Sequence, residues 1–539
     1  MENIIDVIKK QITDLFGDLG EEIVLDIPKN REFGDYSTNI AMQLAKRERR
    51  NPRELAAEFV DKMDFSGTYI DKAEVAGAGF INFYLNDSYL IAVPKNVLEF
   101  GDNYGANDSL KGQKILLEYV SANPTGPMHM GNARGGALGD SLARVMKACG
   151  ADTTREFYLN DSGNQIAKFT NSLYARYMQQ FGEYEFPEDG YHGKDIAELA
   201  AEYTKITGED KLKNISEEEI KAGLTAFGLE RNVADIKRIL GDYRVEYDYW
   251  FHESSMYETG AVEKIVDMLK KTGETYEQDG ALWLKCGDKD EVLVRANGFA
   301  TYFAADIAYH YNKLAERGFD RAINVWGADH HGHIARMKRS MEILGLDPDR
   351  LEVITIQLVR LMRGGEVARM SKRSGESITL GDLLEEIGID SARYFFNMRL
   401  ANSHFDFDLE LAVKQSSDNP VFYVQYAHAR ICSIIESAKE YGNWTGVEPT
   451  YTHEAEQTLI RKIANFPQEV AVSAQILEPS RLTHYAAELA GDFHSFYGAC
   501  KVMVEDEQTR NSRLLLVDSA RQTLKNVLNL LGVTAPERM

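Results

Sequence analysis

The feature that most constrains this chain is a buried strand that leads through a glycine-rich connection into a helix. Residues Lys114-Ile-Leu-Leu-Glu-Tyr-Val120 are short, apolar and rich in branched side chains, which predicts a buried strand. After the connection over residues 121–136, apolar residues recur at helical spacing as far as Cys149-Gly150, where glycine favours a helix end. The chain therefore contains a strand-to-helix connection.

The composition of this connection suits an anionic ligand. Glycines let the backbone approach a ligand closely, and the free amides at a helix N-terminus favour a phosphate group. His129 adds a polarised donor inside the connection. Taken alone, the stretch also fits a tight strand-to-helix turn with one hydrogen-bonded histidine.

A second stretch, Ala368-Arg-Met-Ser-Lys-Arg-Ser-Gly375, has to be interpreted together with the first one. The pair formed by His129-Met-Gly-Asn132 and Met370-Ser-Lys372 resembles the two signatures of class I aminoacyl-tRNA synthetases. The longer stretch Glu118-Tyr-Val-Ser-Ala-Asn-Pro-Thr-Gly-Pro-Met-His-Met-Gly-Asn-Ala-Arg-Gly135 is similar to the arginyl-tRNA synthetase version of the first signature.

Four more stretches are similar to the arginyl-tRNA synthetase family, so the resemblance covers nearly the whole chain. They are Asn160-Asp-Ser-Gly-Asn-Gln165, Val325-Trp-Gly-Ala-Asp-His-His-Gly-His333, Asn419-Pro-Val-Phe-Tyr-Val-Gln-Tyr-Ala-His-Ala-Arg430 and Ala535-Pro-Glu-Arg-Met539.

Composition bounds the class of protein. A chain of 539 residues is too long for one core and should form several domains. No run of eighteen apolar residues predicts a membrane span, and the start of the chain lacks the layout of a signal peptide, so we expect a cytoplasmic protein. The four cysteines are far apart, which argues against a zinc ribbon and against a disulfide framework.

The net charge of −23 opposes indiscriminate nucleic-acid binding, because affinity for the backbone is built on lysine and arginine. It leaves room for selective binding through local basic patches. The candidates are Lys46-Arg-Glu-Arg-Arg50 and Lys338-Arg339, although either run could equally be a solvated helix face.

Three domains are expected from the pattern along the chain. Residues 1–110 form a small N-terminal α/β domain. Residues 111–385 alternate strand-like and helix-like segments, which predicts a doubly wound parallel sheet of Rossmann-like type, interrupted by charged helices near 180–250. Residues 386–539 keep helical spacing without apparent strands, which predicts an all-α bundle. The resemblance implies that the first domain contacts the tRNA elbow and the last one the anticodon stem-loop.

The resemblance further implies an arginine–tRNA ligase, which attaches arginine to the 3′-terminal ribose of its tRNA through an arginyl-adenylate. The first transition state gathers negative charge on phosphoryl oxygens, so the protein must position the reactants and supply donors. We expect His129, Asn132 and Lys372 to be these catalytic donors. The residues expected to bind ATP, as its magnesium complex, are His129, Gly131, Asn132, Gly327, Asp329, His333, Met370, Ser371 and Lys372.

This sequence departs from the His-Ile-Gly-His form of the signature at its last position, where Asn132 stands. An asparagine amide can donate a hydrogen bond but cannot become a cation. A neutral donor should reduce the pH dependence of the step. It also puts in doubt any role for a second histidine in stabilising phosphate charge.

Selection of arginine demands carboxylates and an aromatic face, because a guanidinium is a planar fork of donors. Tyr302 and Asp306 are four residues apart and share one face if they lie on a helix. By resemblance, Glu118, Tyr302 and Asp306 face the guanidinium, while Asn123 and His129 hold the α-amino and carboxylate end. His330 is also expected to line the amino-acid site. Read alone, Tyr302 fits a core aromatic residue and Asp306 a helix-capping carboxylate.

The cluster Asp329-His-His-Gly-His333 could suggest a metal, but its context resembles the ligand-facing segment of the family, and we expect no metal site. Other readings remain open. They are a class I synthetase of glutamyl, cysteinyl or lysyl type, a small nucleotidyltransferase, or a catalytically idle relative that only binds RNA. The resemblance implies a monomer with tRNA, arginine and ATP as partners, and activation of arginine only when tRNA is bound.

Overall fold

The computed structural model describes residues 4–17, 23–28, 30–208, 215–287, 289–328, 331–368 and 378–539. These residues form two compact units. Unit 1 comprises residues 1–104, 431–465 and 491–523, and unit 2 comprises residues 105–430, 466–490 and 524–539. None of the described helices is long and apolar enough to span a membrane.

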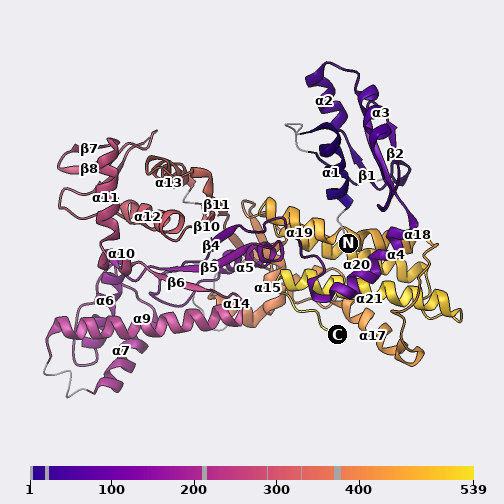
Figure 1. Ribbon diagram of the computed structural model, residues 1–539. Helices are drawn as coiled ribbons and strands as arrows, with labels where there is room; N and C mark the ends of the chain where they lie inside the picture. Colours follow the sequence, from indigo (N-terminus) through magenta and orange to yellow (C-terminus); the bar gives the residue numbers. More distant parts are fainter. Residues whose placement is uncertain are drawn as a thin grey trace. The chain divides into compact units, whose positions relative to one another are not determined.

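The N-terminal part of unit 1 is a three-stranded antiparallel sheet covered by helices, as the sequence predicts for a small α/β domain (Figure 1). The strand order is β1-β3-β2, and α2 and α3 pack on β3. Their bounds are α1 Ile4–Phe16, β1 Tyr36–Thr38, α2 Ile40–Glu48, α3 Pro52–Lys62, β2 Ile70–Ala76, β3 Phe80–Leu85 and α4 Asp87–Phe100.

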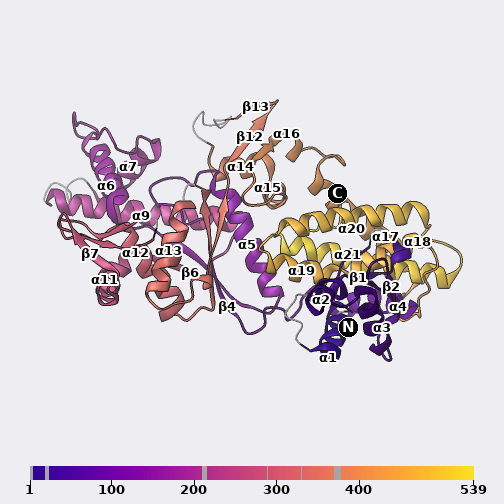
Figure 2. The ribbon, with the colours of Figure 1, turned by 90° about the horizontal axis from the view of Figure 1, so that it is seen from above.

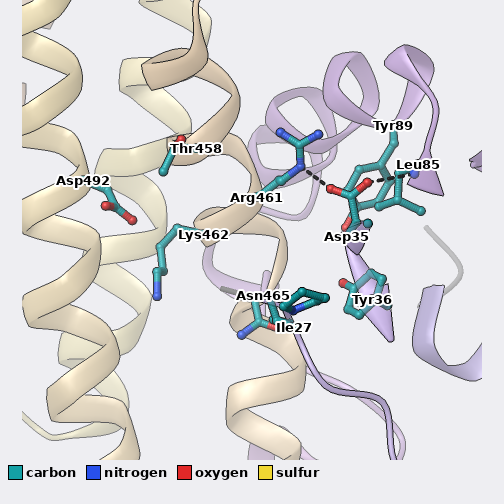
Figure 3. Close-up of a pocket in the computed structure, with 12 residues that line it drawn as sticks. Ile27, Asp35, Tyr36, Leu85, Tyr89, Thr458, Arg461, Lys462, Asn465 and Asp492 are labelled. Atoms are coloured by element: carbon teal, nitrogen blue, oxygen red, sulfur yellow. Dashed lines mark hydrogen bonds and ion pairs between the residues drawn. The ribbon is translucent and has the colours of Figure 1, made fainter. Parts of the chain in front are cut away.

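A charged contact joins this sheet to α18 (Glu454–Ala464) within unit 1 (Figure 3). Arg461 Nε donates to Asp35 Oδ1, while Asp35 Oδ2 accepts the Leu85 amide at 2.8 Å. The Tyr104 hydroxyl donates to the Ile463 carbonyl at 3.0 Å. The two bonds of Asp35 border a pocket of about 330 Å³.

Unit 2 is built on a five-stranded parallel sheet of order β11-β10-β4-β5-β6 (Figure 1). The predicted doubly wound parallel sheet is therefore confirmed. Its strands are β4 Lys114–Glu118, β5 Asp152–Leu159, β6 Tyr249–His252, β10 Arg321–Gly327 and β11 Leu351–Ile356. The predicted strand-to-helix connection runs from β4, which is central in the sheet, to α5 (Asn132–Ala148).

Close packing holds α5 on β4. A Cβ atom at Gly139 would lie 2.2 Å from Cγ of Tyr119, so only glycine lets the helix approach this ring. The Tyr243 hydroxyl donates to the Ala133 carbonyl at 3.1 Å near the helix start. The N-terminus of α5 is thereby held against the end of β4.

One predicted strand lies in a different sheet. The sequence pattern places the segment 292–295 among the strands of the α/β alternation, but β9 (Glu291–Val294) pairs antiparallel with β8 (Ala281–Leu284). Together with β7 (Thr275–Gln278) they form a separate three-stranded sheet. This sheet packs with α11 (Ala261–Thr272) and α12 (Tyr302–Tyr311) around one core.

The interval near 180–250 carries charged helices, as expected. They are α7 (Lys194–Thr207) and the long α9 (Glu217–Asp242), which pack with α6 (Gly163–Met178) (Figure 1). The pattern Ser216-Glu-Glu-Glu-Ile220 predicts a helix that begins after a capping serine, and Ser216 does cap α9 in a capping box with Glu219.

Past residue 351 the structure adds elements that the sequence pattern did not show. β12 (Val359–Arg363) pairs antiparallel with β13 (Glu366–Val367) and parallel with β14 (Phe405–Asp408) (Figure 2). The prediction that no strand follows residue 385 is therefore wrong for β14. This strand follows α14 (Leu380–Ile387) and α15 (Ile389–Asn397), and its alternation Phe405-Asp-Phe-Asp408, with both phenylalanines buried, covers only four residues and is therefore easily missed among helical segments.

The rest of the C-terminal part is helical. Its helices are α16 Leu409–Ala412, α17 Pro420–Ala438, α18, α19 Phe466–Gln475, α20 Ser480–Ala499 and α21 Glu507–Leu530. Two further helices lie in the preceding part of unit 2, namely α10 (Ser254–Glu258) and α13 (His331–Ile343).

A buried arginine ties the end of the chain into unit 2. Arg393 of α15 is fully buried, and its guanidinium pairs with the equally buried Asp140 of α5. The remaining donors reach the carbonyls of Leu531 (2.8 Å), Tyr243 (3.1 Å) and Arg244 (3.0 Å). All three guanidinium nitrogens thus donate hydrogen bonds, which compensates the burial of the charge.

We expect Arg393→Met to lower the stability of unit 2 by about 3–5 kcal/mol, because Asp140 then loses a buried partner and three carbonyls lose donors. Thermal and urea unfolding measure this loss. Arg238→Met is the control, since Arg238 pairs with Asp235 and Asp242 on an exposed face and should change the unfolding midpoint little. An equal effect of both variants would contradict the role given to burial.

Candidate active site

The loop of the first signature pairs with the chain that follows the second signature. The Met130 amide donates to the Ile378 carbonyl (3.2 Å), and the Leu380 amide donates to the Met128 carbonyl (2.8 Å). His129 and Thr379 face each other in this short antiparallel bridge. The loop of the first signature therefore lies beside residues 378–380, which follow the second signature in the sequence. Arg369, Met370, Ser371 and Lys372 themselves lie outside the described residues.

The geometry of His129 defines which of its nitrogens can donate. The Gly131 amide donates to His129 Nδ1 at 3.0 Å, so Nδ1 accepts and the neutral ring carries its proton on Nε2. The ring is exposed, and Asn132, the first residue of α5, is partly exposed. An outward donor thus lies beside a helix N-terminus, which is the arrangement that favours a phosphate.

The chain that leads into the second signature forms a hairpin. Gly364 and Gly365, both with positive φ, form the turn between β12 and β13. Arg363 pairs with Glu386 of α14 at 2.6 Å. The turn end of this hairpin is therefore anchored to α14 within unit 2.

Glu118 lies at the carboxyl end of β4 and is bonded within the fold. Its Oε2 pairs with the Nζ of Lys313 at 2.6 Å, and its Oε1 accepts the Ser121 hydroxyl at 3.0 Å. The exposed fraction is 7% for Glu118 and 0% for Lys313. The guanidinium-facing role expected for Glu118 remains a prediction, and any ligand must share this carboxylate with Lys313.

Tyr302 and Asp306 lie one turn apart at the start of α12, as the spacing predicts. The Tyr302 hydroxyl accepts the Asn164 amide at 3.3 Å, which connects α12 to the Asn160–Gln165 stretch. Asp306 Oδ2 lies 3.0 Å from His333 Nε2. His333, which is expected near ATP, is thus in contact with the carboxylate that is expected near arginine. Gly327, also expected near ATP, is the last residue of β10. Asp329 and His330 lie outside the described residues.

A carboxylate that sequence reasoning missed, Glu253, completes the acidic group. It follows β6 directly and is 2% exposed. With its amide oriented to satisfy its neighbours, Asn160 donates to Glu253 Oε2 at 3.0 Å. The sequence signal that could have identified Glu253 is an acidic residue directly after a strand of the parallel sheet. Because β6 was not predicted as a strand, this signal was overlooked.

The electrostatics of Glu253 differ from those of its neighbours. Burial is the main cause that raises its pKa, and the negative charge of Asp306 adds to the rise against the lowering effect of the Tyr158 and Ser162 hydroxyls. In the described part of the chain no basic side chain pairs with Glu253. A cationic ligand would supply the missing charge.

The charges around this site divide into two groups. Glu118 is neutralised by Lys313, and Glu156 pairs with Arg317 and accepts the Tyr309 hydroxyl at 2.6 Å. Asp306 and Glu253 have no lysine or arginine partner among the described residues. The site therefore keeps an excess of negative charge that suits one cationic group beside the aromatic rings of Tyr158 and Tyr302.

A parallel sheet, a signature loop at the carboxyl end of its central strand and the paired chain after the second signature define a class I aminoacyl-tRNA synthetase. Three family models cover almost all of the sequence. Residues 2–85 match the arginyl tRNA synthetase N terminal domain, residues 95–406 the class I (R) tRNA synthetase catalytic domain, and residues 424–539 the DALR anticodon binding domain. The chain belongs to the arginyl-tRNA synthetase family.

Similar proteins agree with this assignment. The arginine–tRNA ligase of Acetivibrio thermocellus is 50% identical over 565 residues and covers 100% of both chains. That of Caldanaerobacter subterraneus subsp. tengcongensis is 49% identical over 563 residues, again covering 100% of both chains. The structure of Thermus thermophilus arginyl-tRNA synthetase shares the fold, with a TM-score of 0.80, 22% identity and 100% coverage of both chains. The activity is that of an arginine–tRNA ligase, which uses ATP, arginine and tRNA.

The raised pKa of Glu253 predicts a pH-dependent affinity for arginine. A guanidinium binds the ionised carboxylate, so affinity should fall as pH decreases and should begin to fall at a higher pH than an ordinary glutamate would give. Glu253→Gln should flatten this dependence and weaken binding about 10- to 100-fold near neutral pH. Calorimetry with tRNA present, over a range of about pH 5 to 8, measures both effects.

Glu258→Gln is the matched control, because Glu258 is an exposed carboxylate on the neighbouring helix α10. It should keep the wild-type affinity and pH profile. An unchanged profile in Glu253→Gln would remove Glu253 from the arginine site.

Proposed function

We propose that this chain activates arginine with magnesium-bound ATP at the carboxyl end of β4 and transfers it to the 3′-terminal ribose of tRNA. The observation that carries the proposal is the pairing of residues 128–130 with residues 378–380, which joins the loop of the first signature to the chain after the second. Magnesium belongs to the nucleotide substrate, because it is held largely through phosphates.

Charge on the reacting phosphate is met by donors from both signatures. His129 donates through Nε2, and the side-chain amide of Asn132 donates at the positive end of the α5 dipole. Gly131, which has no side chain, leaves room for the phosphate to approach. Met370, Ser371 and Lys372 approach the triphosphate from the other signature, with Lys372 directed to the leaving pyrophosphate. Gly327, Asp329 and His333 complete the nucleotide site.

The arginine side chain lies between two carboxylates that lack a lysine or arginine partner among the described residues. Asp306 and Glu253 accept the guanidinium fork, and Tyr302 supplies an aromatic face and a hydroxyl. Asn123, His129 and His330 hold the α-amino and carboxylate end. Lysine is excluded because a single ammonium leaves one of two desolvated carboxylates unpaired, which costs several kcal/mol.

The remaining properties follow from this assignment. Residues 1–110 contact the tRNA elbow and residues 386–539 the anticodon stem-loop, so that tRNA completes the active site before arginine is activated. The enzyme acts as a monomer in the cytoplasm. Glu118 is already paired with Lys313, and it contributes to the arginine site through the small part of its carboxylate that stays exposed.

ATP–pyrophosphate exchange tests the proposal. The protein is supplied with each of the twenty amino acids, with and without bulk tRNA. Exchange with arginine that appears only when tRNA is added is the expected result. Exchange with another amino acid would overturn the guanidinium site, and arginine exchange without tRNA would overturn the tRNA dependence.

Replacement of the two phosphate donors should lower the rate more than the affinity. We expect His129→Ala and Lys372→Ala each to reduce kcat of arginine activation about 10²- to 10³-fold, because each removes one donor aimed at charge that develops in the transition state. Steady-state exchange measures kcat and the KM for arginine. His192→Asn, a change at an exposed histidine of the insertion, is the control. Equal losses in kcat and in arginine affinity for Lys372→Ala would exclude its transition-state role.

A further inference from the structure

A continuous chain of buried polar side chains connects α12 to the signature loop. Lys313 Nζ donates to Glu118 Oε2 (2.6 Å) and to Asn324 Oδ1 (3.1 Å). Glu118 Oε1 accepts the Ser121 hydroxyl (3.0 Å), whose oxygen in turn accepts the Tyr158 amide (3.1 Å). The chain thus runs from the end of α12, through β4, to the first residue of the loop that carries Asn123 and His129.

The loop end of this chain is a strained turn. Val120 has φ of 71° and Ser121 has φ of 45°, a region that residues with a Cβ rarely adopt and that is least favourable for a β-branched valine. Such a conformation costs of the order of 1–3 kcal/mol and persists only where surrounding bonds hold it. Here the bonds of Ser121 to Glu118 and to the Tyr158 amide hold it.

The other end of the chain is also irregular. Lys313 lies in a π-helical turn, Asn312–Glu316, in which the Arg317 amide bonds to the Asn312 carbonyl at 2.8 Å. This turn places the Lys313 ammonium 3.9 Å from the centre of the Tyr309 ring and within reach of Glu118. π-Helical turns inside helices occur often at functional sites because they redirect one side chain.

Stability does not account for this arrangement. A fully buried ion pair costs so much desolvation that apolar residues of similar volume often stabilise a fold as well or better. Two departures from regular backbone, one at each end, add to that cost. The ion pair of Lys313 and Glu118 therefore serves to hold the connected elements in position.

We propose that Lys313 is a positioning residue for amino-acid activation: through Glu118 and Ser121 it fixes the signature loop relative to the π-helical turn that ends α12, and α12 carries Tyr302 and Asp306 at its other end. The inference rests on the proposed function, in which the loop holds the α-amino and carboxylate end of arginine and α12 holds the guanidinium. The length of the chain then selects the length of the substrate side chain. L-Homoarginine, which has one more methylene than arginine, reports on that length.

Pyrophosphate exchange with tRNA present tests the proposal, with arginine and with homoarginine. Lys313→Met removes the ammonium and keeps the length of the side chain. It should lower kcat with arginine about 10²-fold, since a misplacement of about 1 Å can cost this much, and should reduce the preference for arginine over homoarginine at least about tenfold. Lys264→Met, which removes an exposed pair with Glu316, is the matched control and should leave both values unchanged.

Two further variants separate positioning from folding. In Glu118→Gln/Lys313→Met both charges are gone, but the amide oxygen introduced at position 118 can still accept the Ser121 hydroxyl, so kcat should recover at least about tenfold relative to Lys313→Met. Ser121→Ala breaks the chain at its other end and leaves the ion pair intact, so it should reduce kcat and the preference for arginine without a large change in the melting temperature. It serves in place of Lys313→Met if that variant does not fold.

The proposal is overturned if Lys313→Met lowers the melting temperature but keeps the wild-type kcat and preference. It is also overturned if the double variant is no more active than Lys313→Met, or if Ser121→Ala is fully active. Failure of the proposed function is distinguishable, because it would appear as absent arginine exchange in the wild-type protein and in Lys264→Met alike.

Discussion

The parallel pairing of β4 between β10 and β5 is the constraint on which the functional part of this molecule depends. Residues Lys114–Glu118 register with Asp152–Glu156 on one side, and Ile115–Glu118 register with Arg321–Asn324 on the other. Parallel pairing makes the carboxyl ends of these strands meet at one edge of the sheet, so Glu118, Glu156 and Asn324 become neighbours although they come from distant parts of the sequence. The signature loop leaves from the same edge, which is why it opens next to the acidic group.

Charge balance at that edge explains how one site can bind both a cation and an anion. Lys313 and Arg317 neutralise Glu118 of β4 and Glu156 of β5, whereas Asp306 and Glu253 have no lysine or arginine partner among the described residues. In the proposed site, the phosphate donors are His129 and the Asn132 side chain at the start of α5. The groups proposed for the guanidinium and for the triphosphate thus belong to different elements, so they do not cancel each other's charge.

Much of this architecture was predictable because it is encoded locally. The strand before the first signature, the glycine-rich loop and the helix after it follow from hydrophobic period and glycine placement, and the same reasoning identified Ser216 as a helix cap and Tyr302 and Asp306 as neighbours on a helix face. Short edge elements were harder to predict. β6 and β14 have four residues each and were missed, and β9 was predicted as a strand but assigned to the wrong sheet, because the pairing of a short strand is decided by what it meets in space.

The sequence by itself determined the class of fold, the two signatures and the kinds of residue that could serve them, since these depend on local spacing and on side-chain chemistry. Only the tertiary structure decided which carboxylates form ion pairs within the fold and which do not. Glu118 was expected to face a ligand and is paired with Lys313, 195 residues away, and Glu253 was overlooked and is buried beside Asn160 with its pKa raised. The physical reason is that desolvation and ion pairing depend on distance in three dimensions, and no local pattern records which charges a fold brings together.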